Sequence, residues 1–235
     1  MSSLYNELNY TENIKEIKGV QFGVLSPTEI KNRSVVHVTQ TVLYDGHGEP
    51  IVEGLFDSRM GVIDHGKICP TDNLDNRFCP GYFGHIELAR PVFHIQFIQI
   101  LIKILKCICI RCSNLLIDVN DPELGTIKNK KELFTLVVEK CSKVHICGTS
   151  TEHGCGALQP SKYTKDGLSK IYAEWKDKSV NDELESDNKQ LLTAEFIHKI
   201  FLRITDSDCD AIGLSPKWCR PDWLICSILP VPTPS

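Results

Sequence analysis

The chain has 235 residues, of which 42% are hydrophobic and 24% are charged. These proportions are ordinary for a soluble globular protein and exclude the collagen-like, fully disordered and membrane-spanning classes. The formal net charge is -4, whereas a chain that grips duplex DNA through phosphate contacts alone should be basic. Any contact with nucleic acid must therefore be local or shared with partner chains.

The first elements along the chain are of mixed type. Residues 20–25 alternate weakly, as a strand does, and residues 26–29 (SPTE) are a helix-start signature. Residues 35–42 are rich in β-branched side chains and predict a strand, and the glycines and proline of residues 46–50 predict a turn. Residues 66–84 have almost no periodic apolar pattern, so something other than a hydrophobic core must hold them.

Three helices are expected in the middle and later parts of the chain. Residues 92–107 are apolar on nearly every face and predict a mostly buried helix, with His94 as a packed core histidine. A second helix is expected at about residues 130–140 with Asn129 as its cap. A third should follow Thr193, where apolar residues recur at helical spacing.

The remaining late segments are a connection and a strand. Residues 176–189 are polar and predict a flexible surface connection. Residues 223–229 predict a strand before a proline-rich end. The aspartates of residues 206–210 alternate in a way that could suit magnesium, but a solvated turn at a helix end is the favoured interpretation. No Walker loop, GxGxxG, HExxH or GxSxG motif is present in the sequence.

The chain contains eleven cysteines, eight of them between Cys69 and Cys155. Residues 1–16 are polar and lack the apolar core of a secretory signal. A disulfide framework is therefore disfavoured, and clustered cysteines are better interpreted as metal ligands in a reducing compartment.

Four of these cysteines have the spacing of a zinc site. Cys109 and Cys112 form a Cys-x2-Cys pair, 34 residues separate them from Cys147, and Cys155 follows after seven more. Four thiolates can close a tetrahedron around a structural zinc ion. The alternative is that they are unrelated small hydrophobic residues, which are common in cores. The neighbouring Cys107 could exchange with Cys109 as a ligand, but only Cys109 fits the knuckle spacing. The other unpaired cysteines are assigned to packing, namely Cys141, Cys209, Cys219 and Cys226.

A second group supplies fewer ligands. The pattern Cys69-x2-Asp72-x6-Cys79-x2-Tyr82 offers only two good zinc ligands, with His65, His85 and Asp72 as nearby reserves. Spacing alone leaves open whether this group binds zinc, and the absence of a site is favoured.

The sequence resembles a known family at several places in the family's order. Residues 57–94 (DSRMGVIDHGKICPTDNLDNRFCPGYFGHIELARPVFH) resemble the N-terminal clamp region of the largest subunit of multisubunit DNA-directed RNA polymerases, in particular the eukaryotic RNA polymerase II type and its relatives in large DNA viruses. Residues 107–118 (CICIRCSNLLID) are similar to the family's second zinc-binding segment. Residues 147–168 are similar to the closing half of that site, and residues 220–235 (RPDWLICSILPVPTPS) to the segment that leads out of the clamp core.

The resemblance implies an α+β fold of mixed helices and short strands with zinc-braced loops, like the clamp core of that family, over residues 1–235. Its zinc-braced part would span about residues 57–170, followed by the connection at about 176–189 and a return segment over 190–235. It also implies partners: the second-largest and smaller polymerase subunits, the DNA template and the RNA–DNA hybrid, with no membrane. The implied location is the nucleus, or a cytoplasmic viral factory or virion for a viral source.

The resemblance carries over Cys109, Cys112, Cys147 and Cys155 as the ligands of one zinc site, so about one structural Zn2+ is expected. The family's other site has the pattern Cys-x2-Cys-x6-Cys-x2-His, and two of its four ligands are replaced here. We expect the Cys69 and Cys79 site to be empty or to use His85 as a weak substitute, with Tyr82 and Phe83 packing the loop. A tyrosine with a pKa near 10 is a poor zinc ligand at neutral pH.

The family's catalytic aspartates, which hold Mg2+, lie beyond its clamp region, and this chain has no such motif. The chain alone is therefore predicted to be inactive, with nucleotidyltransferase activity and Mg2+ only in the complete polymerase. We expect a fragment, the first piece of a split gene or a shortened chain.

Candidate contacts with DNA or the hybrid are Lys162, Lys165 and Lys170, with a solvated basic face as the alternative. The alternative function is an unrelated zinc-braced protein-interaction module, which would not assemble with a second large polymerase subunit.

Overall fold

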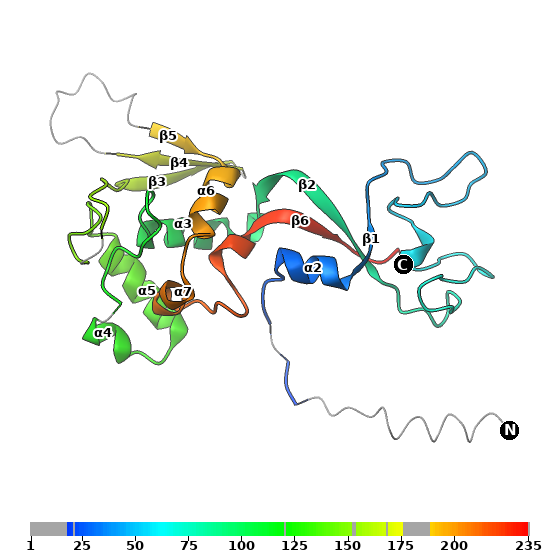
Figure 1. Ribbon diagram of the computed structural model, residues 1–235, viewed down its shortest axis with the longest axis horizontal. Coiled ribbons are helices and arrows are strands. Elements are labelled where there is room, and N and C mark those ends of the chain that lie inside the picture. Colours follow the sequence, from blue (N-terminus) through cyan, green and yellow to red (C-terminus); the bar gives the residue numbers. More distant parts are fainter. Residues whose placement is uncertain are drawn as a thin grey trace.

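The computed structural model describes residues 18–20, 22–119, 121–151, 154–167, 169–175 and 189–234. Two three-stranded sheets organise these residues (Figure 1). The first sheet has the order β1 (Ser34–His37), β2 (Phe83–Phe93), β6 (Ile225–Val231), and the second has the order β3 (Lys162–Asp166), β4 (Lys170–Glu174), β5 (Lys189–Leu192).

The first sheet links two ends of the molecule. β1 runs parallel to β2, and β2 runs antiparallel to β6. Figure 1 shows β2 and β6 as a long ribbon that leads from a lobe of helices to a loop-rich end formed by residues 38–82. At that end a small core gathers Val36, Val38, Met60 and Val231. A Cβ atom at Gly84 would lie 2.5 Å from Met60 Sδ, so a side chain there would displace the buried Met60 side chain.

The helices other than α2 form the lobe at the other end of the ribbon. The buried residues of α3 join those of α5, α6, α7 and the inner face of the second sheet in one large hydrophobic core. Helix α2 lies instead against β2 and β6. The helices are α2 (Pro27–Arg33), α3 (Ile98–Cys107), α4 (Pro122–Gly125), α5 (Lys130–Cys141), α6 (Ala194–Phe201) and α7 (Asp206–Ile212), with 3-10 turns at Ser58–Met60, Ile95–Phe97 and Pro221–Leu224.

The mixed α+β architecture predicted from the sequence is confirmed, as are three predicted helix caps. Ser26 and Glu29 form a capping box at the start of α2. The side chains of Asn129 and Thr193 accept hydrogen bonds from the first turns of α5 and α6. Such caps satisfy backbone N–H groups that have no partner within the helix.

Several predicted boundaries are wrong. Residues 20 and 22–25 form no strand, and the strand expected over 35–42 ends at His37. The helix expected from residue 92 begins at Ile98, because Val92 and Phe93 pair with β6 instead. Tertiary pairing therefore outweighs the apolar pattern of this segment.

At the end of the chain, β6 begins at Ile225 rather than residue 223, because residues 221–224 form a 3-10 turn. The aspartates at 206–210 lie in α7 itself, which Thr205 caps, and not in a turn. Residues 176–188 of the predicted connection are outside the described residues, and Lys189 begins β5. Among the described residues no helix combines the length and apolar character needed to cross a bilayer.

Candidate metal centre

Two loops of the helical lobe bring four cysteines together. One sulfur atom from each of Cys109, Cys112, Cys147 and Cys155 lies within 4.8 Å of the others. The sulfur atoms of Cys109 and Cys155 are 3.5 Å apart, and those of Cys112 and Cys147 are 3.7 Å apart. Four ligands at about 2.3 Å from one tetrahedral zinc ion lie about 3.8 Å from each other. The spacing predicted from the sequence therefore agrees with the geometry.

The first loop is a tight knuckle that follows α3. An isolated bridge joins Ile108 to Leu115. Inside it the Cys109 N–H donates to the Asn114 carbonyl and the Ser113 N–H donates to the Cys109 carbonyl, each at 2.9 Å. Ser113 has a φ of 68°, a conformation that few non-glycine residues adopt. This turn directs both thiols of the pair to one side.

The second loop is closed by glycine contacts. Cys147 and Ala157 are joined by a backbone hydrogen bond of 3.0 Å. A Cβ atom on Gly154 would lie 2.0 Å from the Gly148 Cα, so neither backbone leaves space for a side chain at their contact. The loop between Cys147 and Cys155 can therefore curl back on itself.

Gln159 supports the site although the sequence did not single it out as a functional residue. Its side chain is buried, its Nε2 donates to Cys109 Sγ at 3.2 Å and its Oε1 accepts from the Ile110 N–H at 3.0 Å. The Arg111 N–H also donates to Cys109 Sγ, at 3.4 Å. Hydrogen bonds of this kind orient and stabilise thiolate ligands. The only signal in the sequence was its place just after Cys155.

The local environment affects the four thiols differently. Burial raises the pKa of Cys147 to about 12 and also raises the pKa of Cys112. The Ala157 N–H lowers the pKa of Cys155 to about 7. Four thiolates can coexist at this distance only when a cation offsets their charge.

Cys107 and Cys141 are outside this group. Both are buried, and the Cys107 thiol contacts the Lys103 carbonyl at 3.3 Å and interacts with Cys141. The interpretation of Cys141 as a packing residue agrees with this placement, and Cys109 rather than Cys107 belongs to the group of four.

The second cysteine group lies in the loop-rich end. Ligand atoms of Cys69, Asp72 and Cys79 lie within 4.8 Å of one another. Its backbone repeats the knuckle described above: the Cys69 N–H donates to the Leu74 carbonyl, and the Asn73 N–H donates to the Cys69 carbonyl. Asn73 has a φ of 58°.

Asp72 and Tyr82 occupy the positions of the second cysteine and the histidine in the pattern Cys-x2-Cys-x6-Cys-x2-His. Asp72 Oδ1 accepts from the Leu74 N–H at 2.9 Å, as Cys112 does from Asn114 in the other knuckle, and Tyr82 Oη donates to Asp72 Oδ2 at 3.2 Å. Phe83 is 51% exposed, so about half of its side chain stays outside the hydrophobic packing that was expected for this loop.

The histidines expected as reserves have other contacts. His85 stacks on His37 of β1 rather than joining this group. His65 lies 3.1 Å from Asn76. Burial, with a further contribution from His37, lowers the pKa of His85.

The three candidate lysines lie on the second sheet and are exposed. Lys162 pairs with Glu174 and Lys170 with Asp166, whereas Lys165 pairs with Ile171. Because side chains alternate along a strand and Ile171 is buried, Lys162 and Lys170 lie on the outer face and Lys165 on the other. The structure therefore brings only two of the three to one face.

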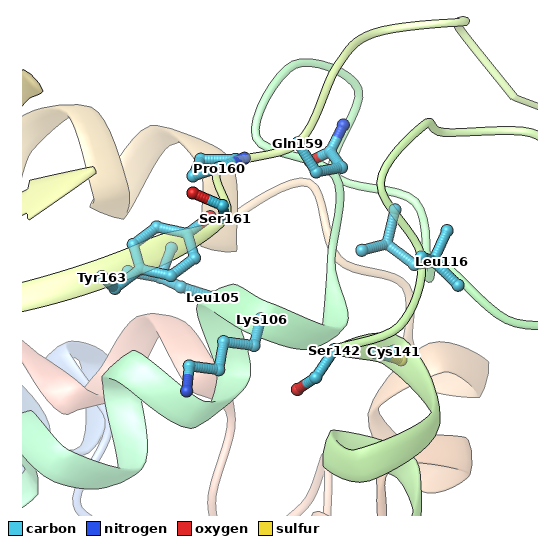
Figure 2. Close-up of a pocket in the computed structure, with 10 residues that line it drawn as sticks. Leu105, Lys106, Leu116, Cys141, Ser142, Gln159, Pro160, Ser161 and Tyr163 are labelled. Carbon is cyan, nitrogen blue, oxygen red and sulfur yellow. The ribbon is translucent and has the colours of Figure 1, made fainter. Parts of the chain in front are cut away.

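A small pocket adjoins the first metal group. Figure 2 shows Tyr163 and Pro160 above Lys106 and Ser142, with Gln159 at one side. Its volume is about 60 Å³, far below the range of several hundred Å³ that small-molecule sites occupy. Burial raises the pKa of Tyr163 well above its ordinary value. The pocket is therefore no candidate for a substrate site.

Comparison with known proteins gives two findings. The model of the family "RNA polymerase Rpb1, domain 1" matches residues 14–235. A curated relative, the DNA-directed RNA polymerase II subunit RPB1 of Euplotoides octocarinatus, is 42% identical over 238 residues, which cover 96% of this chain and 49% of the relative. The chain thus spans about half the length of that relative.

Proposed function

Because the chain belongs to the RNA polymerase Rpb1 domain 1 family, the N-terminal region of the largest subunit of DNA-directed RNA polymerase, we propose that it forms the clamp part of such an enzyme. In this role it helps to hold DNA and the RNA–DNA hybrid during transcription. The observation that carries the proposal is the match over residues 14–235. The same match excludes the alternative of an interaction module of unrelated descent.

The proposed activity belongs to the assembly and not to this chain. The second-largest and smaller polymerase subunits are its proposed partners, and the nucleus is its proposed location. Nucleotidyl transfer would require the Mg2+ site of the complete enzyme, for which this chain supplies no motif. By itself the chain would be inactive.

The proposed cofactor is one structural zinc ion. Cys109, Cys112, Cys147 and Cys155 are four soft donors at tetrahedral spacing. Bound there, zinc would supply a cross-link and no reactive position. The four residues would join the end of α3 to the loop before β3, and Gln159 would hold Cys109 in place.

The Cys69 group is proposed to hold no zinc. Its Asp72 and Tyr82 side chains bond to each other, and the carboxylate already accepts a hydrogen bond from the knuckle backbone. The phenol of Tyr82 is a poor zinc ligand at neutral pH, so this group offers fewer soft donors than the four thiols of the Cys109 group.

Lys162 and Lys170 are the proposed contacts with nucleic acid, since they share the exposed outer face of the second sheet. Each of the two lysines pairs with an acidic residue on the neighbouring strand, so its contribution to the affinity for nucleic acid should be modest. In the assembled polymerase, Lys162→Gln with Lys170→Gln should reduce the salt dependence of DNA binding, whereas Lys165→Gln should not.

Assembly tests the proposed function most directly. The full chain should co-purify with the second-largest polymerase subunit of its source. The exposed double variant Lys143→Gln with Lys199→Gln is the control and should assemble equally. If the folded, zinc-loaded chain fails to associate with that subunit at micromolar concentrations, the clamp proposal is wrong.

A further inference from the structure

Three side chains outside both cysteine groups come together on the first sheet. His37 of β1 and His85 of β2 are paired in register, and their rings stack with centroids 4.8 Å apart and planes inclined by 6°. Glu87 lies two residues beyond His85 on β2 and therefore on the same face of the sheet. One ligand atom of each lies within 4.8 Å of those of the other two.

Hydrogen bonds around His85 determine which ring nitrogen carries the proton. Ser34 Oγ donates its only proton to the Val36 carbonyl at 2.8 Å. In the 2.7 Å contact between Ser34 Oγ and His85 Nδ1, the ring nitrogen must then be the donor. The neutral imidazole consequently has a free lone pair on Nε2. A hydrogen bond on the other nitrogen is the usual support of a metal-bound histidine.

We propose that His37, His85 and Glu87 form a binding site for a divalent transition-metal ion of the zinc class. Two imidazoles and one carboxylate are a donor set that zinc prefers, and three protein ligands leave a position for water. Zn–N bonds of about 2.0 Å require the two nitrogens to lie within about 4 Å of each other. His37 is exposed, so its ring can rotate to meet this distance.

Lys31 is the competitor for this site. Its Nζ contacts Glu87 Oε1, and both side chains are 47% exposed. An ion pair with this exposure contributes little free energy, and the carboxylate keeps a second oxygen. The metal ion can therefore share the Glu87 carboxylate with Lys31 or displace Lys31 from it. Removal of the lysine charge should strengthen metal binding.

The site would connect the two strands that flank the loop-rich end. β1 ends where residues 38–82 begin, and β2 starts where they end. A metal ion held by both strands would close this segment at its base. The inference depends neither on the zinc proposed at Cys109 nor on polymerase assembly.

Zn2+ titration of the full chain, already carrying zinc at the Cys109 group, tests this proposal. Free zinc is followed with a chromophoric chelator, and the histidine ring nitrogens are followed by NMR. We expect about one further zinc per chain, with shifts confined to the ring signals of His37 and His85. His37→Gln should abolish this binding, and His47→Gln, at an exposed histidine outside the group, should not.

Two further variants distinguish specific coordination by these three residues from nonspecific binding of zinc to the protein surface. Ser34→Ala should weaken binding by roughly 10-fold through loss of the support to Nδ1, and Lys31→Gln should strengthen it. Circular dichroism confirms folding of each variant. The proposal is overturned if no further zinc binds, if His37→Gln binds as wild type does, or if the further zinc is lost in Cys79→Ser instead.

Discussion

The Cys109 and Cys69 groups share one backbone and differ in their side chains. Both knuckles have an isolated bridge, the same two backbone hydrogen bonds and a residue at positive φ. In one, four thiols converge, whereas in the other a carboxylate takes the place of a thiol and bonds to a tyrosine. The comparison teaches that a knuckle can keep its shape when a carboxylate that accepts the same backbone hydrogen bond takes the place of a thiol.

Removal of one thiol should have the largest effect. Cys112→Ser leaves three ligands, so we expect loss of zinc and destabilisation on the order of several kcal/mol, because zinc binding and folding are coupled. Elemental analysis and thermal melting measure the two effects. The control Cys226→Ser, at a half-buried cysteine of β6, should cost roughly 1 kcal/mol and no zinc. Unchanged melting of Cys112→Ser would contradict a structural role for zinc.

Restoring the missing ligands should give the opposite effect. Asp72→Cys with Tyr82→His recreates a four-ligand set on a knuckle whose backbone is already formed. We expect about one additional zinc per chain and a higher melting temperature in zinc-containing buffer. Asp72→Ser with Tyr82→Phe, which adds no ligand, is the matched control. An equal zinc content in both variants would show that the shared backbone is not sufficient.

In the loop-rich end we expect a buried carboxylate to have the stabilising role that we propose for zinc at the Cys109 group. Asp57 is 2% exposed and accepts hydrogen bonds from the Glu53 N–H, the Arg59 N–H and the Arg59 guanidinium. The Arg59 carbonyl in turn accepts hydrogen bonds from Cys69 Sγ and Thr71 Oγ1. We expect Asp57→Asn to cost about 2 kcal/mol, with faster hydrogen exchange confined to residues 38–82.

This contribution should depend on pH. Burial raises the pKa of Asp57, but the hydrogen bonds from Arg59 and the backbone outweigh burial and leave it below its ordinary value. A carboxyl with a lowered folded-state pKa stabilises fully above its unfolded pKa of about 3.9 and loses that effect as pH falls through the folded value. The difference in the free energy of unfolding between Asp57→Asn and the wild type should therefore shrink as the pH falls below about 3.9. The same difference at pH 3 and pH 7 would contradict the assignment.

The smallest effect is expected at Gln159. Gln159→Ala removes the donor to Cys109 Sγ and should weaken zinc binding by roughly 10-fold, measured by chelator competition. Gln190→Ala, at an exposed glutamine of β5, is the control. Equal affinities would mean that the Cys109 group needs no support from Gln159.

The sequence predicted that these four cysteines converge, because their spacing is typical of two loops that share one zinc ion. It could not predict the contact of His37 with His85, since this depends on the register between two strands separated by the whole loop-rich end. Gln159 was missed because its role exists only once two loops meet. The start of α3 was misplaced because pairing of Val92 with Cys226 extends β2 into an apolar run.

The ribbon of β2 and β6 has a mechanical consequence. Its register shifts between Glu87 and Val92, and irregularities of this kind bend a strand and increase its twist. Pro91, which lacks an N–H, falls in this interval. The ribbon is therefore bent and twisted at these few residues, and this bend sets the direction in which the loop-rich end projects from the helical lobe.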